Sequence, residues 1–140
     1  MLGGRVRVSS NLYLVFDSTN GGASLPQLVQ GLGIFGYSFS AEPLKSFIEP
    51  PGEPQAPVRC GFYAQNYFRV FISDSAVQFC REVALPSDLA DGEKQLLAAI
   101  FRRTDVRLRR WIITSEDWDD DDKPTVQILS EGTDKATLSI

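Results

Sequence analysis

Regular alternation of apolar and polar residues is the feature that most constrains the fold of this chain. From Val6 to Phe16, one set of alternate positions is apolar or serine, and the other set is largely polar. Successive side chains of a strand point to opposite faces, so this pattern predicts a strand with one buried face. The turn residues Asn20, Gly21 and Gly22 end the strand.

A second alternating region, residues 58–85, predicts a meander of three antiparallel strands. Tyr63 is expected to pair with Tyr67, and Ser73 with Ala76. This pairing brings eight apolar side chains onto one face: Val58, Cys60, Phe62, Phe68, Val70, Ile72, Val77 and Phe79. A shift of one residue would divide the set between both faces. A helix over 75–84 is the competing interpretation, because its apolar residues also fit a period of 3.6, but the strand is favoured.

Two helices are expected beside the sheet. The longer one runs from about 88 to 103, with acidic residues near its start and Arg102 and Arg103 at its end, where they complement the helix dipole. A short helix is expected at about 25–31, with Ser24 as its N-cap.

Further strands are expected at 106–114 and 125–129, followed by a short strand that ends at Leu138. The chain shows no internal repeat and no sign of a second core. These elements together predict one α+β domain over residues 1–140, mainly antiparallel sheet with the meander 58–85 at its centre.

A proline-rich segment, residues 41–57, contains five of the eight prolines. Proline keeps its own and the preceding residue extended and cannot donate to a sheet ladder, so a long ordered connecting loop is expected. Leu44, Phe47 and Ile48 are candidates to pack onto the core. The PxxP spacing beginning at Pro51 also fits a polyproline ligand, but basic flanking residues are missing and the connector is favoured.

The residue types disfavour catalysis. There is no histidine, which is the commonest general base and metal ligand. Cys60 and Cys80 are expected on opposite faces of the meander, beyond disulfide reach, as packing residues. The acidic run has the alternating spacing of a calcium loop, yet Asp122 stands where that loop needs glycine. A non-enzymatic protein without cofactor or metal is therefore expected, and a carboxylate enzyme with a divalent ion is the weakest alternative.

A reversal of charge occupies residues 102–122. Five arginines are followed by six of the eighteen acidic residues, and such segregated charge steers association without performing chemistry. The acidic loop 115–123 is predicted to bind a partner protein with a basic surface. Its candidate residues are Glu116, Asp117, Trp118, Asp119, Asp120, Asp121 and Asp122. An equally weighted alternative is that Trp118 packs onto the core and the aspartates protect a sheet edge.

The outer face of the meander carries the alternative site, an arginine and aromatic surface for RNA or single-stranded nucleic acid. Its residues are Arg59, Tyr63, Tyr67, Arg69 and Phe71. Arginines interleaved with aromatic rings suit base stacking, but a net charge of −4 and the absence of a nucleic-acid-binding motif weigh against it.

The leading expectation is a non-enzymatic protein-binding domain. Two versions are open: an inhibitor or immunity-type protein that uses the acidic loop, and a structural subunit of a larger, for example viral, assembly. No apolar run has the length of a secretory signal or a membrane span, so a cytoplasmic protein without a membrane partner is expected. The sequence does not determine the oligomeric state.

Overall fold

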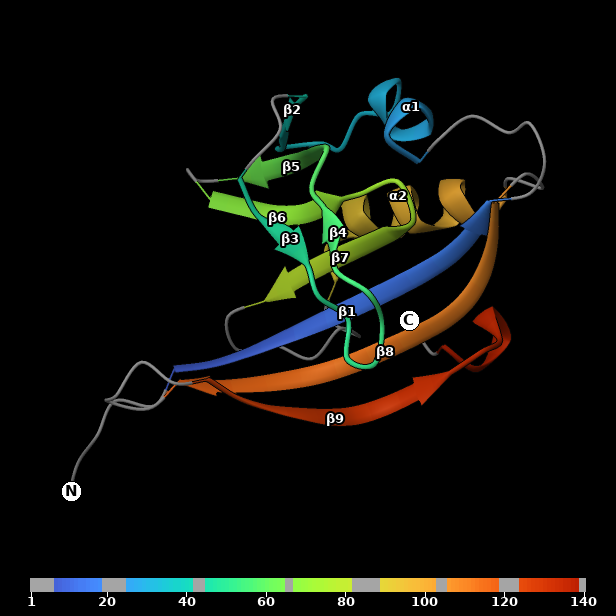
Figure 1. Cartoon of the computed structure of the whole chain (residues 1–140). Coiled ribbons are helices and arrows are strands. Elements are labelled where there is room, and N and C mark those ends of the chain that lie inside the picture. Colours follow the sequence, from blue (N-terminus) through green and yellow to red (C-terminus); the bar gives the residue numbers. More distant parts are fainter. Residues whose placement is uncertain are drawn as a thin grey trace.

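The computed structural model describes residues 7–18, 25–41, 45–64, 67–81, 89–102, 106–118 and 124–138. It confirms an α+β fold dominated by one antiparallel sheet (Figure 1). The elements are β1 (Arg7–Ser18), α1 (Leu25–Gln30), β2 (Ser38–Ser40), β3 (Phe47–Ile48), β4 (Ala56–Pro57), β5 (Cys60–Ala64), β6 (Tyr67–Ile72), β7 (Ala76–Arg81), α2 (Asp91–Phe101), β8 (Val106–Trp118), β9 (Pro124–Gly132) and a C-terminal 3₁₀ turn (Lys135–Thr137).

The seven-stranded sheet has the order β2-β5-β6-β7-β1-β8-β9. The predicted strand at 6–16 becomes β1, which joins the meander β5-β6-β7 to the β8-β9 pair. In Figure 1, α2 lies behind the sheet, whereas the short β3-β4 pair crosses in front of it. The sheet is therefore covered on both faces.

The main core lies between the sheet and the helices. Alternate residues of β1, namely Leu12, Leu14 and Phe16, point into it, as the alternation predicts. From α2, Leu97 and Ile100 pack against the same cluster. Each of these five side chains is at most 4% exposed, so helix and sheet bury a continuous apolar layer.

The predicted pairing of the meander is correct for β6 and β7 and wrong for β5 and β6. Ile72 pairs with Val77 as expected, but Cys60 pairs with Ile72 rather than with Val70. The register then shifts, since Phe62 pairs with Val70 and Tyr63 with Phe68, leaving Arg69 as an extra residue.

Six of the eight predicted side chains join the main core, and the bulge explains why Phe68 does not. Phe68 turns toward Tyr63, with ring centroids 5.3 Å apart, and toward Phe71. Gly61 allows this, because a Cβ there would lie 2.9 Å from the Phe68 ring. Val58 precedes β5 and belongs to the core on the other face.

The proline-rich segment builds that second core. Its β3-β4 pair places Ile48 beside Val58, and both pack onto Tyr13 and Ile112 of the sheet. The burial predicted for Ile48 is confirmed, whereas Phe47 is 55% exposed and that prediction is wrong. Leu44 lies outside the described residues. The described part of the proline-rich segment 41–57 thus covers the second face of the sheet, and the β3-β4 pairing holds it together; we call this segment the lid.

Several predicted boundaries shift. The strand alternative for 75–84 is confirmed as β7, and α2 is shorter than the predicted helix. Residues 115–118, predicted as the start of a loop, continue β8 because β1 and β9 pair with them on both sides. The predicted last strand is wrong: Asp134 accepts a hydrogen bond from the amide of Ala136 and starts a 3₁₀ turn. Within the described residues, no helix has the length and apolarity needed to cross a membrane.

Candidate functional site

Glu116 and Asp117 lie near the end of β8, where β1 and β9 begin, at the left in Figure 1. Glu116 and Asp117 belong to β8 and are partly buried, and Trp118 is its last residue. The side chain of Trp118 and the whole of residues 119–122 lie outside the described part of the structure. Three of the seven predicted partner-binding residues are therefore carried on a strand rather than on a loop.

Glu116 is connected to a polar chain on the second face of the sheet. Asn11 donates a hydrogen bond of 3.5 Å to Glu116 and accepts one of 3.1 Å from Gln78, which also donates to the Tyr13 hydroxyl. Asn11 is 4% exposed, so this chain of hydrogen bonds positions the Glu116 side chain from inside the fold. Burial, followed by the nearby Cys80, Glu116 and Glu49, raises the pKa of Tyr13 above its ordinary value.

β9 is an edge strand with apolar side chains in solvent. It spans nine residues, and among the described strands it pairs with β8 alone. Val126, Ile128 and Leu129 are 50%, 46% and 48% exposed. An uncovered edge offers unpaired backbone groups, and proteins usually protect it with lysine, proline or charge. Between Pro124 and Gly132 the only ionisable residue is Glu131, so most of β9 lacks that protection.

Two apolar residues of the β9 edge and one acidic residue of β8 lie on the same face of the sheet. Val126 pairs with Glu116, and Ile128 pairs with Thr114, so Val126 and Ile128 share a face with Glu116. Asp117 pairs with the neighbouring Thr125, so its side chain belongs to the opposite face of the same edge. We call the sheet edge formed by Glu116, Asp117, Val126, Ile128 and Leu129 the β9 surface. One face of it combines Val126 and Ile128 with the Glu116 carboxylate, an apolar strip with a charged border of the kind found in protein interfaces.

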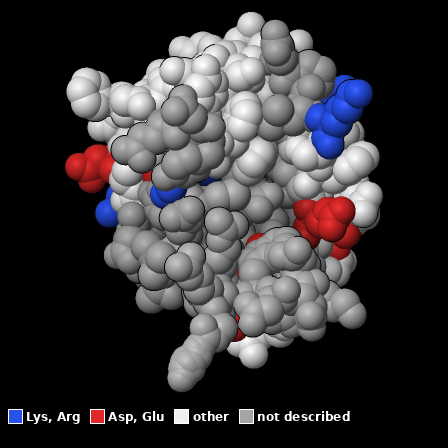
Figure 2. Space-filling model, turned by 90° about the vertical axis from the view of Figure 1, so that its left-hand side faces the viewer, with Lys and Arg blue, Asp and Glu red and all other residues white. Residues whose placement is uncertain are grey.

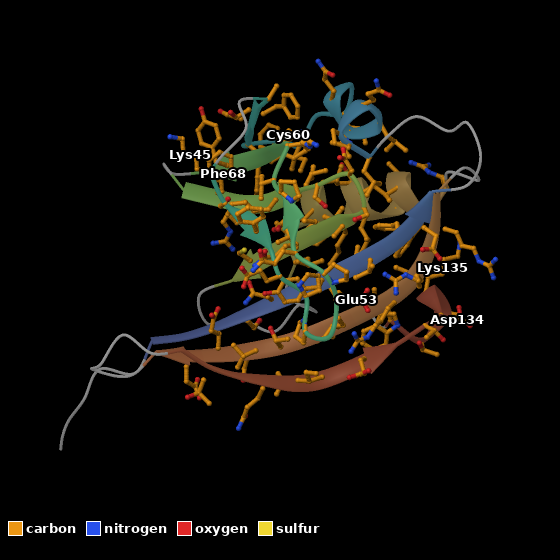
Figure 3. All side chains as sticks on the ribbon, viewed as in Figure 1. Lys45, Glu53, Cys60, Phe68, Asp134 and Lys135 are labelled. Carbon is orange, nitrogen blue, oxygen red and sulfur yellow. The ribbon has the colours of Figure 1, made fainter. Side chains whose placement is uncertain are left out.

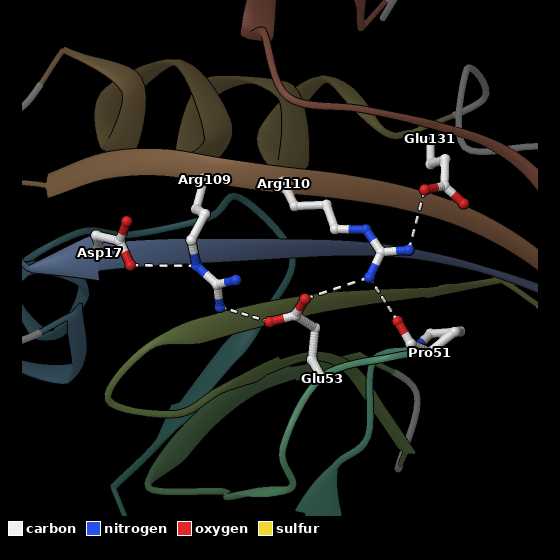
Figure 4. Close-up of polar contacts among 6 residues, drawn as sticks. All are labelled: Asp17, Pro51, Glu53, Arg109, Arg110 and Glu131. Atoms are coloured by element: carbon white, nitrogen blue, oxygen red, sulfur yellow. Dashed lines mark hydrogen bonds and ion pairs between the residues drawn. The ribbon is translucent and has the colours of Figure 1, made fainter.

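Within the described residues, the ion pairs of Arg109 and Arg110 in β8 lead to acidic residues other than Glu116 and Asp117. Arg109 contacts Asp17 at 3.1 Å and also Glu53, while Arg110 contacts Glu53 at 3.2 Å and Glu131 at 3.1 Å (Figure 4). Arg110 also donates a 2.7 Å hydrogen bond to the Pro51 carbonyl. Arg109 and Arg110 are thus neutralised within the fold.

Glu53 is the central residue of this network, and sequence reasoning did not single it out. Its side chain is 9% exposed and lies between the two arginines (Figure 4). The hydrogen bond from Arg109 and then that from Arg110 hold the pKa of Glu53 below its ordinary value, against the opposing effect of burial. The network connects the proline-rich lid to β8, the strand that pairs with β9.

The predicted nucleic-acid face is not one open platform. Arg59 lies outside β5 and pairs with Asp74 at 3.2 Å. Phe71 packs beside the lid residues, and Tyr63 packs against Phe68. Arg69 is only partly exposed and has its own interactions, and the side chain of Tyr67 is outside the described residues. The structure brings the five residues into one sheet region but occupies most of their surfaces with packing and ion pairs.

Described charges are dispersed over the end of the molecule shown in Figure 2, which looks from the left of Figure 1. Lysines, arginines and acidic residues appear there in small separate groups. Within the described part of the chain, no three cysteine, aspartate or glutamate side chains gather as a metal site. Cys60 and Cys80 do not form a disulfide with each other, and Cys60 belongs to the main core.

Comparison with known proteins adds no assignment. No family model, no curated protein and no solved structure matches the chain.

Proposed function

We propose that this protein is a non-enzymatic protein-binding domain that binds its partner along the β9 surface. The observation that carries the proposal is the edge position of β9 together with three half-exposed apolar side chains on it, two of which, Val126 and Ile128, share a face with Glu116. Exposed apolar residues gathered on one edge and bordered by charge are typical of interaction sites.

The partner segment that fits this surface is an extended strand with basic and apolar side chains. Strand addition gives affinity through backbone hydrogen bonds, while alternate side chains give specificity. Val126 and Ile128 offer apolar contacts on one face, and Glu116 attracts a basic side chain on the same face. The polar chain through Asn11 and the pairing of β8 on both sides hold this arrangement in place before binding.

The acidic run increases the attraction. Residues 119–122 add four carboxylates directly after β8. A local negative field accelerates encounter with a basic partner, and salt weakens the effect. Of the two versions open from the sequence, the apolar character of β9 favours an assembly subunit, since such interfaces are more apolar than those of transient inhibitors.

The test is affinity capture from the native host with two matched variants. Ile128→Lys places a charge on the apolar strip, and Phe35→Lys makes the same change in charge at a side chain that is 99% exposed elsewhere. Neither position is buried, so both variants are expected to fold. A protein captured by the wild type and by Phe35→Lys, lost from Ile128→Lys and insensitive to nuclease supports the proposal.

Three results would contradict it. These are an equal capture by all three proteins, recovery of nucleic acid in place of protein, and loss of the partner from both variants. A second variant tests the acidic run: changing residues 119–122 to asparagine is expected to slow association and flatten its salt dependence, with thermal unfolding nearly unchanged. Unaltered association kinetics would remove the acidic run from the account and leave β9 alone.

A further inference from the structure

A separate cavity lies on the helix side of the molecule, between α2 and the C-terminal 3₁₀ turn. Its volume is about 370 Å³, within the range of roughly 300–1,000 Å³ common for small-ligand sites. The apolar lining comes from Leu97, Ala98 and Phe101 on one side of α2 and from Leu138 after the turn. Leu97 and Leu138 are buried, so the floor of the cavity is continuous with the main core.

The wall formed by the C-terminal turn is held by specific contacts. The indole of Trp111 donates to the Asp134 carbonyl at 3.0 Å and to the Thr137 hydroxyl at 3.2 Å. The Thr137 hydroxyl in turn donates to the Asp134 carbonyl at 2.7 Å. Gly132 permits the approach, because a Cβ there would lie 2.7 Å from the indole nitrogen. The turn is therefore fixed to β8, which keeps the cavity preformed.

The rim of the cavity carries positive charge. Lys94 and Arg102 come from α2 and Lys135 from the turn, and among the described residues that line the cavity none is acidic. Lys135 lies over the Phe101 ring, 5.8 Å from its centroid. Within the described part of the chain, none of these three cations forms an ion pair. Three like charges around one apolar cavity repel one another, and an anion held between them would relieve the repulsion.

We infer that this cavity binds a small amphipathic anion, an aliphatic chain that ends in one carboxylate. The apolar floor would take the chain, while the rim cations would hold the carboxylate through charge-assisted hydrogen bonds. Both requirements come from the lining residues, and the site is independent of the β9 surface. The protein would thus carry a ligand on its helix side and a partner on its sheet edge.

The test is isothermal titration of the full chain with decanoate, using decan-1-ol and acetate as probes that lack the charge and the chain. Decanoate is expected to bind at one site, and each of the other two much more weakly. The double variant Arg102→Gln/Lys135→Gln should weaken decanoate binding by about tenfold, since an exposed ion pair contributes roughly two- to fivefold.

A matched control removes the same charges elsewhere. Lys45→Gln/Arg59→Gln also deletes one lysine and one arginine, and Figure 3 shows Lys45 at the opposite end of the molecule from Lys135. This control should bind decanoate like the wild type. Ala98→Trp, at an exposed position of α2 that faces the cavity, should abolish binding while circular dichroism stays unchanged.

Any of three outcomes overturns the inference. The first is that decanoate does not bind at one site. The second is that decan-1-ol binds as tightly as decanoate, which would show that the rim cations play no role. The third is that the control double variant Lys45→Gln/Arg59→Gln weakens decanoate binding as much as Arg102→Gln/Lys135→Gln does. Retained binding in a folded Ala98→Trp variant would place decanoate outside this cavity and would also overturn it.

Discussion

Replacing Glu53 by glutamine tests how the proline-rich lid is held. Glutamine keeps the shape of the side chain and one carbonyl oxygen but removes the charge between Arg109 and Arg110 (Figure 4). Its amide group also points a donor at one of two guanidinium groups that can only donate. The substitution therefore removes an attraction and adds a poor contact, without creating a cavity.

The expected loss of stability follows from burial and from the remaining partners. Glu53 is nearly buried, so the loss exceeds the 0.2–1 kcal/mol that is roughly the value of an exposed pair. Neither arginine is left alone, because Arg109 keeps Asp17 and Arg110 keeps Glu131 and the Pro51 carbonyl. The loss thus stays below the roughly 3–5 kcal/mol of a stranded buried charge. We expect about 1–2 kcal/mol, or a fall in Tm of about 3–7 °C.

The loss should depend on pH in a defined direction. Because the pKa of Glu53 is lowered in the folded protein, its contribution is fully present above its ordinary pKa of 4.5 and disappears as the pH falls through the lower folded value. Urea unfolding of wild type and Glu53→Gln at pH 7 and pH 3 measures this. The difference between the two proteins should be about 1–2 kcal/mol at pH 7 and should shrink at pH 3.

Asp74→Asn is the matched control. It removes the charge from the Arg59–Asp74 pair, whose side chains are 53% and 58% exposed, and should change stability by less than about 1 kcal/mol. The reasoning is refuted if Glu53→Gln is as stable as the wild type at pH 7, or if its deficit is the same at both pH values.

Three further changes test other parts of the fold. Gly132→Ala should destabilise the protein by about 1–3 kcal/mol in urea unfolding, because the new Cβ would meet the Trp111 indole; a neutral effect would show that the turn moves freely. Burial and then Asp74 raise the pKa of the Cys60 thiol to about 11, so at pH 8 native Cys60 should react with iodoacetamide about 100-fold more slowly than in urea, as followed by peptide mass; similar rates would disprove its burial. The raised pKa of Tyr13 means that its contribution to stability is present below pH 10 and is lost as the pH rises further. Alkaline titration at 295 nm of the wild type and Tyr13→Phe, each native and in urea, isolates Tyr13: the absorbance that the wild type gains over Tyr13→Phe should appear at higher pH in the native protein than in urea, and its appearance at the same pH in both would contradict this.

Local periodicity was sufficient to predict the main elements. β1 and β7 follow from alternation, since each is long enough for a period of two to repeat. The register of β6 and β7 was also predictable, because a short turn at Asp74 and Ser75 connects them and fixes their pairing. These features depend on residues close together in the sequence.

The pairing of β5 with β6 depended on contacts that the sequence does not display. The bulge at Arg69 forms because Phe68 packs against Tyr63 over Gly61, and this choice is made by three-dimensional packing. The same limit applies to the C-terminus, where Trp111 fastens a 3₁₀ turn in place of the expected strand.

The candidate site was only partly visible beforehand. The acidic residues stand out in the sequence, and a strand at 125–129 was predicted. That β9 is the edge of the sheet follows from strand order, which is a property of the whole fold. Glu53 likewise meets Arg109 and Arg110 only after the lid has folded over β8, more than 50 residues away in sequence.

The most direct test of the β9 surface as a binding site is photo-crosslinking in the native host. A benzoylphenylalanine at position 126 keeps the strip apolar and probes its contacts, and the same residue in place of the exposed Gln95 on α2 serves as the control. We expect a discrete protein adduct from position 126 and none from position 95. No adduct from position 126, or the same adducts from both positions, would contradict it.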